Sequence, residues 1–303
     1  MRITQNMMSN IFVTNLRKQT EAMLQRQEQI STQKRINRPS DDPAGMGRVL
    51  AGRSTLAAIA QYADNIKQGK TRLEFSEETL KTVDDLVQQA RQTAEQKSGD
   101  GVSAEDRALA AEQIKETYDQ VMQLANSKLG GRYIFSGHQT DAEAFTRDAN
   151  YNATYNGDDG NYRIPIADHI EVTVDADGRN YFQDAANGGV NIFDELRDLI
   201  TGLENTDLAA GSAQIRATVD PLEAAHAQIM NKRSEASPKL YRLQATEEHW
   251  TNVANTVQAA IDRDEGVDVA QAIIELKNLE TAYESTMAAA SRIIQPSLVN
   301  FLK

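Results

Sequence analysis

Both ends of this 303-residue chain follow helical periodicity, and the stretch between them does not. From about Ser9 to Ile36 there is no Gly or Pro, and apolar residues recur at helical spacing. At the other end, an apolar stripe runs from Val269 to Ile294 in steps of three, four and seven. A lone helix cannot bury such a stripe, so we expect the two terminal helices to pack against each other.

The two terminal patterns differ in strength. Leu16, Met23 and Ile30 recur every seven residues, but Gln19 and Gln27 occupy positions where a strong zipper carries apolar residues. The C-terminal stripe is more regular, and we expect it to serve both as intrachain core and as a contact surface for neighbouring copies. Its candidate interface positions are Val269, Ile273, Leu276, Tyr283, Met287 and Ile294, followed by Leu298 and Phe301 near the C-terminus.

Long helices are expected between the two ends. Asp42 before Pro43 is typical of a helix start, and the pattern that follows continues nearly to Gly99. Some 55 residues of helix correspond to a rod of roughly 80 Å. Ser103 with Asp106 predicts the cap of an antiparallel partner, which we expect to end at Gly130-Gly131.

The middle of the chain is predicted to form β-strands. Arg163–Ile166 and Ile170–Val174 alternate or are β-branched, and Asp175–Gly178 is interpreted as a hairpin turn. Helical pattern returns after Gly189, where Asn191 with Asp194 predicts a cap.

The last long helical pattern contains Pro221 and Pro238. Each proline is expected to kink the helix or to lie near the first turn of a helix. We therefore expect a mainly α fold, a long antiparallel helical rod or coiled coil with a small β-rich domain at its tip. The expected division is residues 1–36 with 266–303 for assembly, 37–130 with 191–265 for the long helices, and 131–190 for the β-rich domain.

Composition excludes several function classes. The formal net charge of −12 disfavours a nucleic-acid binder, which needs a basic face. The absence of cysteine excludes disulfides, thiolate metal sites and cysteine catalysis. No apolar run approaches a membrane span, and the first ten residues lack an apolar secretory core. The chain is therefore expected to be cytoplasmic or exported by a route that does not read such a signal.

A resemblance to a known family enters at residues 36–45. Ile36-Asn37-Arg38-Pro39-Ser40-Asp41-Asp42-Pro43-Ala44-Gly45 resembles the signature near the N-terminus of the bacterial flagellin superfamily. Met1–Thr4, Tyr133–Gly137 and Ser297–Leu302 resemble corresponding segments of its hook–filament junction subfamily, the hook-associated protein 3 group. The candidate signature residues are Asn37, Pro39, Asp41, Asp42, Pro43, Ala44 and Gly45.

The resemblance implies a structural subunit between hook and filament, without catalysis or cofactor. It implies export through the flagellar type III apparatus and a cytosolic chaperone that binds the C-terminal region. It also implies a ring of identical subunits, another hook-associated protein on the hook side and flagellin on the filament side. The terminal segments of such proteins are poorly ordered in the monomer and fold when subunits meet.

Other interpretations are weaker. A calcium loop starting at Asp148 fails, because Ala153 stands where the sixth-position Gly belongs and Asp159 where the final Glu belongs. The four histidines are scattered, and no phosphate-binding loop, dinucleotide fingerprint or nucleophile motif occurs. The alternatives that remain are filament flagellin itself and, from a different class, a cytoplasmic signalling coiled coil.

Overall fold

The computed structural model describes residues 5–99, 101–175, 177–184 and 188–294. It is mainly α with a small β-rich region, as the sequence predicts. The chain divides into two compact units, residues 1–59 with 252–303 and residues 60–251. This boundary does not test the three-part division expected from sequence, which stays a prediction.

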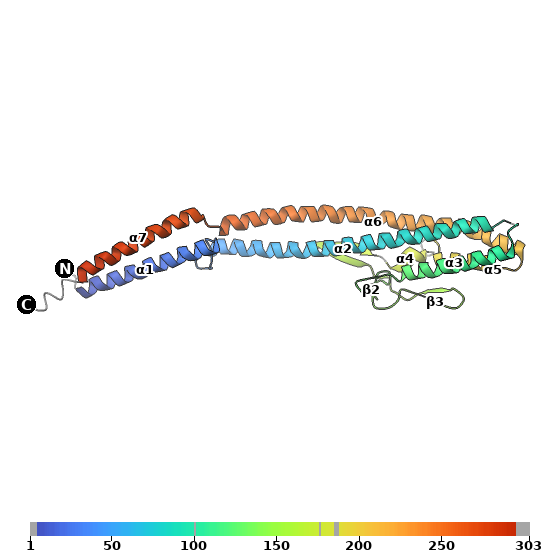
Figure 1. The fold of residues 1–303 in the computed structure, drawn as a ribbon, viewed down its shortest axis with the longest axis horizontal. Helices are drawn as coiled ribbons and strands as arrows, with labels where there is room; N and C mark the ends of the chain where they lie inside the picture. Colours follow the sequence, from blue (N-terminus) through green and yellow to red (C-terminus); the bar gives the residue numbers. More distant parts are fainter. Residues whose placement is uncertain (1–4, 100, 176, 185–187, 295–303) are drawn as a thin grey trace, which may run out of the picture. The chain divides into compact units, whose positions relative to one another are not determined.

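The first unit contains the terminal helices α1 (Gln5–Thr32) and α7 (Val269–Ile294). They lie side by side and run antiparallel (Figure 1). Helix α1 stops where Gln33 adopts a left-handed φ of 59°, the usual backbone state just past a helix end. Helix α7 starts after Asp268, whose carboxylate accepts the Gln271 N–H at 3.0 Å and so caps the helix.

The same unit holds the first part of α2 (Pro43–Lys97) and the last part of α6 (Leu208–Glu265). Gly52 brings these helices together, since a Cβ at that position would lie 2.8 Å from Ile261 Cγ1. Ile261 and Val49 are buried beside it. A small residue at the crossing therefore sets how closely the two helices approach.

The second unit adds α3 (Ala104–Ala125) and α5 (Ile192–Glu204) to the remaining lengths of α2 and α6. Both predicted caps are present: Ser103 Oγ accepts the Asp106 N–H at 3.1 Å, and Asn191 Oδ1 accepts the Phe193 N–H at 3.2 Å. The caps are local features, so the sequence specifies them directly.

Helix α6 continues through both of its prolines, Pro221 and Pro238. A proline removes one backbone hydrogen bond but does not by itself end a helix that neighbouring helices support. Leu222 and Leu243 of α6 are fully buried nearby. The expected interruption of this run is therefore not a helix boundary.

The β-rich region consists of three separate antiparallel hairpins. Their strands are β1 (Lys128–Leu129) with β2 (Arg132–Tyr133), β3 (Phe145–Arg147) with β4 (Ala153–Tyr155), and β5 (Tyr162–Ala167) with β6 (Ile170–Asp175). The last pair confirms the two strands predicted from alternation, and Ile164 faces Val172 across it.

Two predicted turns are wrong. Gly130-Gly131 does not end α3, which already stops at Ala125; these glycines form the β1–β2 turn with φ of 60° and 82°. The segment 175–178 is not a hairpin turn, because Asp177 instead caps the short helix α4 (Gly178–Phe182). The β5–β6 turn lies earlier, at His169 with φ of 57°.

The β5–β6 hairpin packs one face on the long helices of its unit. Ile164 and Val174 lie against Gly69 of α2, and a Cβ at that glycine would overlap Ile164 Cδ1. Trp250 of α6 donates its indole N–H to the Ile166 carbonyl at 2.7 Å and stacks on Tyr62 with ring centroids 5.4 Å apart. The single tryptophan therefore fastens the hairpin to α6.

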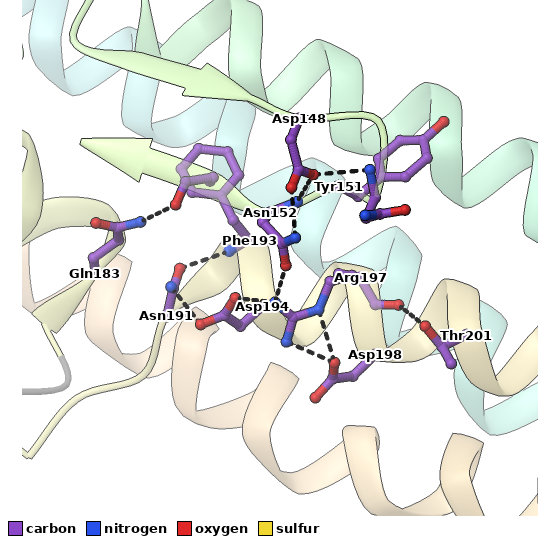
Figure 2. A network of polar contacts seen from close by, with 12 residues as sticks. Asp148, Tyr151, Asn152, Gln183, Asn191, Phe193, Asp194, Arg197, Asp198 and Thr201 are labelled. Atoms are coloured by element: carbon purple, nitrogen blue, oxygen red, sulfur yellow. Dashed lines mark hydrogen bonds and ion pairs between the residues drawn. The ribbon is translucent and has the colours of Figure 1, made fainter. Parts of the chain in front are cut away.

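A network of polar contacts joins the β3–β4 turn to α5 (Figure 2). Arg197 Nη1 donates to Asn152 Oδ1 at 3.0 Å and to Asp194 Oδ1 at 2.7 Å. Asn152 in turn donates to Asp148 Oδ2 at 2.7 Å. The acidic and amide side chains that resembled a calcium loop thus order a turn and bind a guanidinium.

Arg107 is fully buried in the same unit. Its guanidinium donates to the Gly99 and Leu208 carbonyls at 3.2 and 2.9 Å and to Ser212 Oγ at 2.6 Å. These acceptors come from the α2–α3 turn and from the start of α6. The Arg107 side chain therefore links the α2–α3 turn to the start of α6, two segments that are distant in sequence.

Candidate assembly site

The intrachain face of the terminal pair is partly the predicted one. Leu16, Met23 and Ile30 of α1 are half-buried, as are Leu276 and Tyr283 of α7. The two helices therefore bring these five candidate residues into one pairing region.

Three predicted interface residues of α7 lie outside the intrachain seam. Val269, Ile273 and Met287 are 36, 51 and 47% exposed. The pairing face of α7 is rotated toward Ala272, which is 3% exposed, and toward half-buried Leu279. The spacing of apolar residues shows that a stripe exists, but the small side chain of Ala272 gives little signal that this residue is buried.

The other predicted interface residues lie near the C-terminus, and their side chains fall outside the described part of the chain. Ile294 lies in α7, but its side chain is outside the described residues, as are Leu298 and Phe301. Their assignment to an interface stays a prediction.

Polar contacts cross the seam at two levels. Gln19 Nε2 donates to Thr286 Oγ1 at 3.1 Å, and Arg26 Nε lies 2.9 Å from Glu275 Oε2. Both Gln19 and Gln27 interrupt the apolar pattern of α1, yet Gln27 is exposed and only Gln19 enters the seam.

The signature loop is organised by its two aspartates. Asp41 Oδ2 accepts the backbone N–H groups of Asn37 and Arg38 at 3.0 and 2.8 Å. Asp42 Oδ1 accepts the Gly45 N–H at 2.9 Å, so it caps α2 as predicted. That backbone hydrogen bond, aided by Arg35, lowers the pKa of Asp42.

Gly45 is required by close packing. A Cβ there would lie 2.5 Å from Asp42 Oδ2 and 2.7 Å from Ile36 Cδ1, and Ile36 is itself buried. Asn37 is half-buried, whereas Pro39, Pro43 and Ala44 are exposed. The aspartates and the glycine hold the loop together, and the exposed members lie on its outer surface.

The signature loop, which connects α1 to α2, pairs with the connection between α6 and α7 in the same unit. We call residues 33–42 and 264–268 together the elbow. Lys34 and Gly266 form an isolated antiparallel bridge, and the Arg35 N–H donates to the Glu265 carbonyl at 2.6 Å. The elbow thus links the α1–α2 connection to the α6–α7 connection through main-chain atoms.

Charged side chains reinforce the elbow. Arg48 binds Asp264 with two hydrogen bonds, and Arg53 and Lys34 both pair with Glu265, which is only 5% exposed. The Arg48 contact lowers the pKa of Asp264. The roles of Asp264 and Glu265 could not be predicted from the sequence, because their partners lie more than 200 residues away.

Within the described residues, no group of three His, Asp or Glu side chains is placed to hold a metal ion. Among the described helices, none combines the length and apolar character needed to cross a bilayer. What the first unit offers is a paired set of helices with apolar residues left on the outside.

Residues 3–140 match the family model described as the bacterial flagellin N-terminal helical region. Over these residues the chain is similar to bacterial flagellins. The flagellar hook-associated protein 3 of Salmonella typhimurium is 32% identical over 146 residues, which are 48% of this chain and 46% of that protein. The match thus spans about half the length of that relative.

More distant likenesses cover more of this chain. The flagellar filament 33 kDa core protein of Treponema phagedenis is 21% identical over 269 residues, 88% of this chain and 87% of that protein. The solved flagellar hook-associated protein-3 of Legionella pneumophila superimposes with a TM-score of 0.63 at 15% identity, covering 71% of this chain and 98% of that one. The structural likeness shows that the fold is shared.

Proposed function

We propose that this chain is a structural subunit at the junction between the flagellar hook and filament, on which the flagellin filament is assembled. The role is mechanical and involves no catalysis. It is supported by the family, by the 32% identity to a hook-associated protein 3, and by the apolar surface of the terminal helices.

The exposed apolar residues are the observation that carries the proposal. After α1 and α7 have paired, Ile11, Val13 and Leu24 of α1 remain 50, 52 and 59% exposed, and Ile273 and Ile274 of α7 remain 51 and 56% exposed. Burying them against neighbouring copies would remove apolar surface from water and favour a polymer over a free chain.

The partners follow from the resemblance. Identical subunits form a ring, another hook-associated protein lies on the hook side, and flagellin lies on the filament side. A cytosolic chaperone binds the C-terminal region before export through the flagellar type III apparatus. In this proposal the protein ends outside the cell, at the hook–filament junction.

The test is electron microscopy of a strain lacking the chain. We expect hooks without filaments and flagellin shed into the medium, with both defects restored by the wild-type chain. Filaments of normal length on the mutant would exclude the junction role.

Filament flagellin is the second candidate, favoured by the similarity to the Treponema filament core protein along 88% of this chain. It predicts the protein along the whole filament, whereas the junction role predicts it only at the filament base. Immunogold labelling of sheared flagella separates the two.

A further inference from the structure

Gln19 is a polar residue in the middle of an otherwise mainly apolar seam. It lies one helical turn from Leu16 and Met23, which are half-buried against α7. Its amide N–H donates to Thr286 Oγ1 at 3.1 Å, while its carbonyl oxygen is buried without a donor in the described structure. Gln27, which also interrupts the apolar pattern of α1, is exposed.

Thr286 cannot supply the missing donor without losing another bond. Its hydroxyl already donates to the Ala282 carbonyl, with the two oxygens 2.8 Å apart. The contact therefore runs in one direction, from Gln19 through the Thr286 hydroxyl to the α7 backbone. Turning the amide over would leave its NH₂ group without this acceptor, so the Gln19 side chain stays only partly satisfied in either orientation.

An alignment shifted by one heptad satisfies Gln19 less well. A shift of α1 by one heptad along α7 would place Gln19 opposite residue 279 or residue 293, which are Leu and Ile. Both of its amide groups would then be buried against apolar side chains, which is costlier than the observed contact. An apolar side chain at position 19 would remove this penalty, so that only the elbow and the Arg26–Glu275 pair would oppose the shift.

We propose that Gln19 helps to determine the register of α1 on α7 along the seam, in addition to the elbow, which joins Lys34 to Gly266 at one end of the helix pair. The Arg26–Glu275 pair contributes less, because both side chains are 36% exposed and the pair is therefore weakened by solvent. A single polar residue in a helix seam is a known way to fix alignment at some cost in stability. The inference concerns the intrachain pair and does not depend on where in the flagellum the chain lies.

Disulfide trapping in the full chain tests this directly, because the protein has no cysteine of its own. The observed contacts place position 23 at the level of position 279. Leu279→Cys is combined with Met23→Cys for the observed register, or with Leu16→Cys or Ile30→Cys for a shift of one heptad either way. Cross-linked fractions are measured after mild oxidation, on the free and the assembled chain.

We expect the 23–279 pair to dominate by at least tenfold in the parent sequence. Gln19→Leu should raise the 16–279 or 30–279 fraction about tenfold, and the swap Gln19→Thr with Thr286→Gln should restore the single register. Gln27→Leu is the matched control at an exposed site, and it should change no fraction.

Two results would overturn the proposal. One is a Gln19→Leu chain that still cross-links only at 23–279, which would assign the register to other contacts. The other is a parent chain that cross-links equally at all three pairs, which would mean that no register is fixed. Because oxidation traps paired helices even when they form transiently, a less stable variant still gives an answer.

Discussion

The guanidinium of Arg48 faces the carboxylate of Asp264 with two hydrogen bonds, from Nε at 2.8 Å and from Nη2 at 3.0 Å. The two residues are 216 positions apart and belong to the start of α2 and the end of α6. The main-chain carbonyl oxygen of Asp264 also accepts a hydrogen bond from the Arg35 guanidinium, at 2.8 Å. This pair therefore stabilises the elbow, which connects the terminal helices α1 and α7 to the long helices α2 and α6.

The elbow should lose stability in acid. Arg48 lowers the pKa of Asp264, and the Gly45 N–H lowers that of Asp42. A carboxylate with a depressed folded-state pKa stabilises the fold fully above its unfolded pKa, near 3.9, and this stabilisation is lost as pH falls through the lower folded value. Thermal unfolding of wild type and of Asp264→Asn, from pH 7 to pH 2.5, should show a smaller drop in the variant. Parallel curves would contradict the assignment.

Gly45→Ala should destabilise the first unit. The new Cβ would meet Asp42 Oδ2 at 2.5 Å and Ile36 Cδ1 at 2.7 Å, which disturbs both the helix cap and a buried side chain. We expect a loss of about 1–3 kcal/mol in the free energy of unfolding, measured by urea titration. Gly47→Ala is the control in the same turn of helix, because nothing lies within 4 Å of its added Cβ. It should stabilise by about 0.5–1 kcal/mol, since alanine favours helix more than glycine does.

Aspartate substitutions on α7 should separate folding from assembly. Ile273 is 51% exposed, so Ile273→Asp should leave the free chain's unfolding curve nearly unchanged while preventing filament growth on hooks. Leu276→Asp places a charge in the half-buried seam, and Met23→Asp does the same from α1; both should weaken the helix pair and also prevent assembly. Motility plates and microscopy report assembly, and circular dichroism melting reports folding.

Asn278→Asp is the matched control for these substitutions, since position 278 is an exposed polar site on the same helix. It should leave both assembly and stability intact. Normal motility in the Ile273→Asp strain would refute the use of this surface for assembly.

Arg107→Met should destabilise the second unit by about 1–3 kcal/mol. The substitution keeps much of the apolar stem but removes the donors for the Gly99 and Leu208 carbonyls and for Ser212. Hydrogen exchange followed by mass spectrometry should show faster exchange in the α2–α3 turn and at the start of α6. Arg132→Met, at an exposed position, should leave both regions unchanged.

The sequence predicts the features whose causes are local. Asp42 caps α2, Ser103 caps α3 and Asn191 caps α5, because each cap is specified within three or four residues. The same local reasoning failed at Asp177 and at Gly130. An Asp-Gly pair suits a hairpin turn and a helix start equally well, and a pair of glycines suits a helix end and a turn equally well.

The candidate site was harder to predict because its contacts are long-range. Periodicity indicated that α1 and α7 each carry an apolar stripe, but it does not show that α7 buries Ala272 and leaves Ile273 exposed. Likewise, nothing near Glu265 in sequence indicates that Lys34 and Arg53 pair with it. Such contacts depend on where two distant segments meet.

The three hairpins of the β-rich region can each change in length independently. Each closes its own hydrogen-bond ladder and shares no strand with the others, so a change of length in one loop alters no neighbouring register. The β5–β6 tip at His169, whose side chain is 93% exposed, is one such loop. Foreign peptide sequences inserted at that tip should be displayed on the molecule while its helices fold as before.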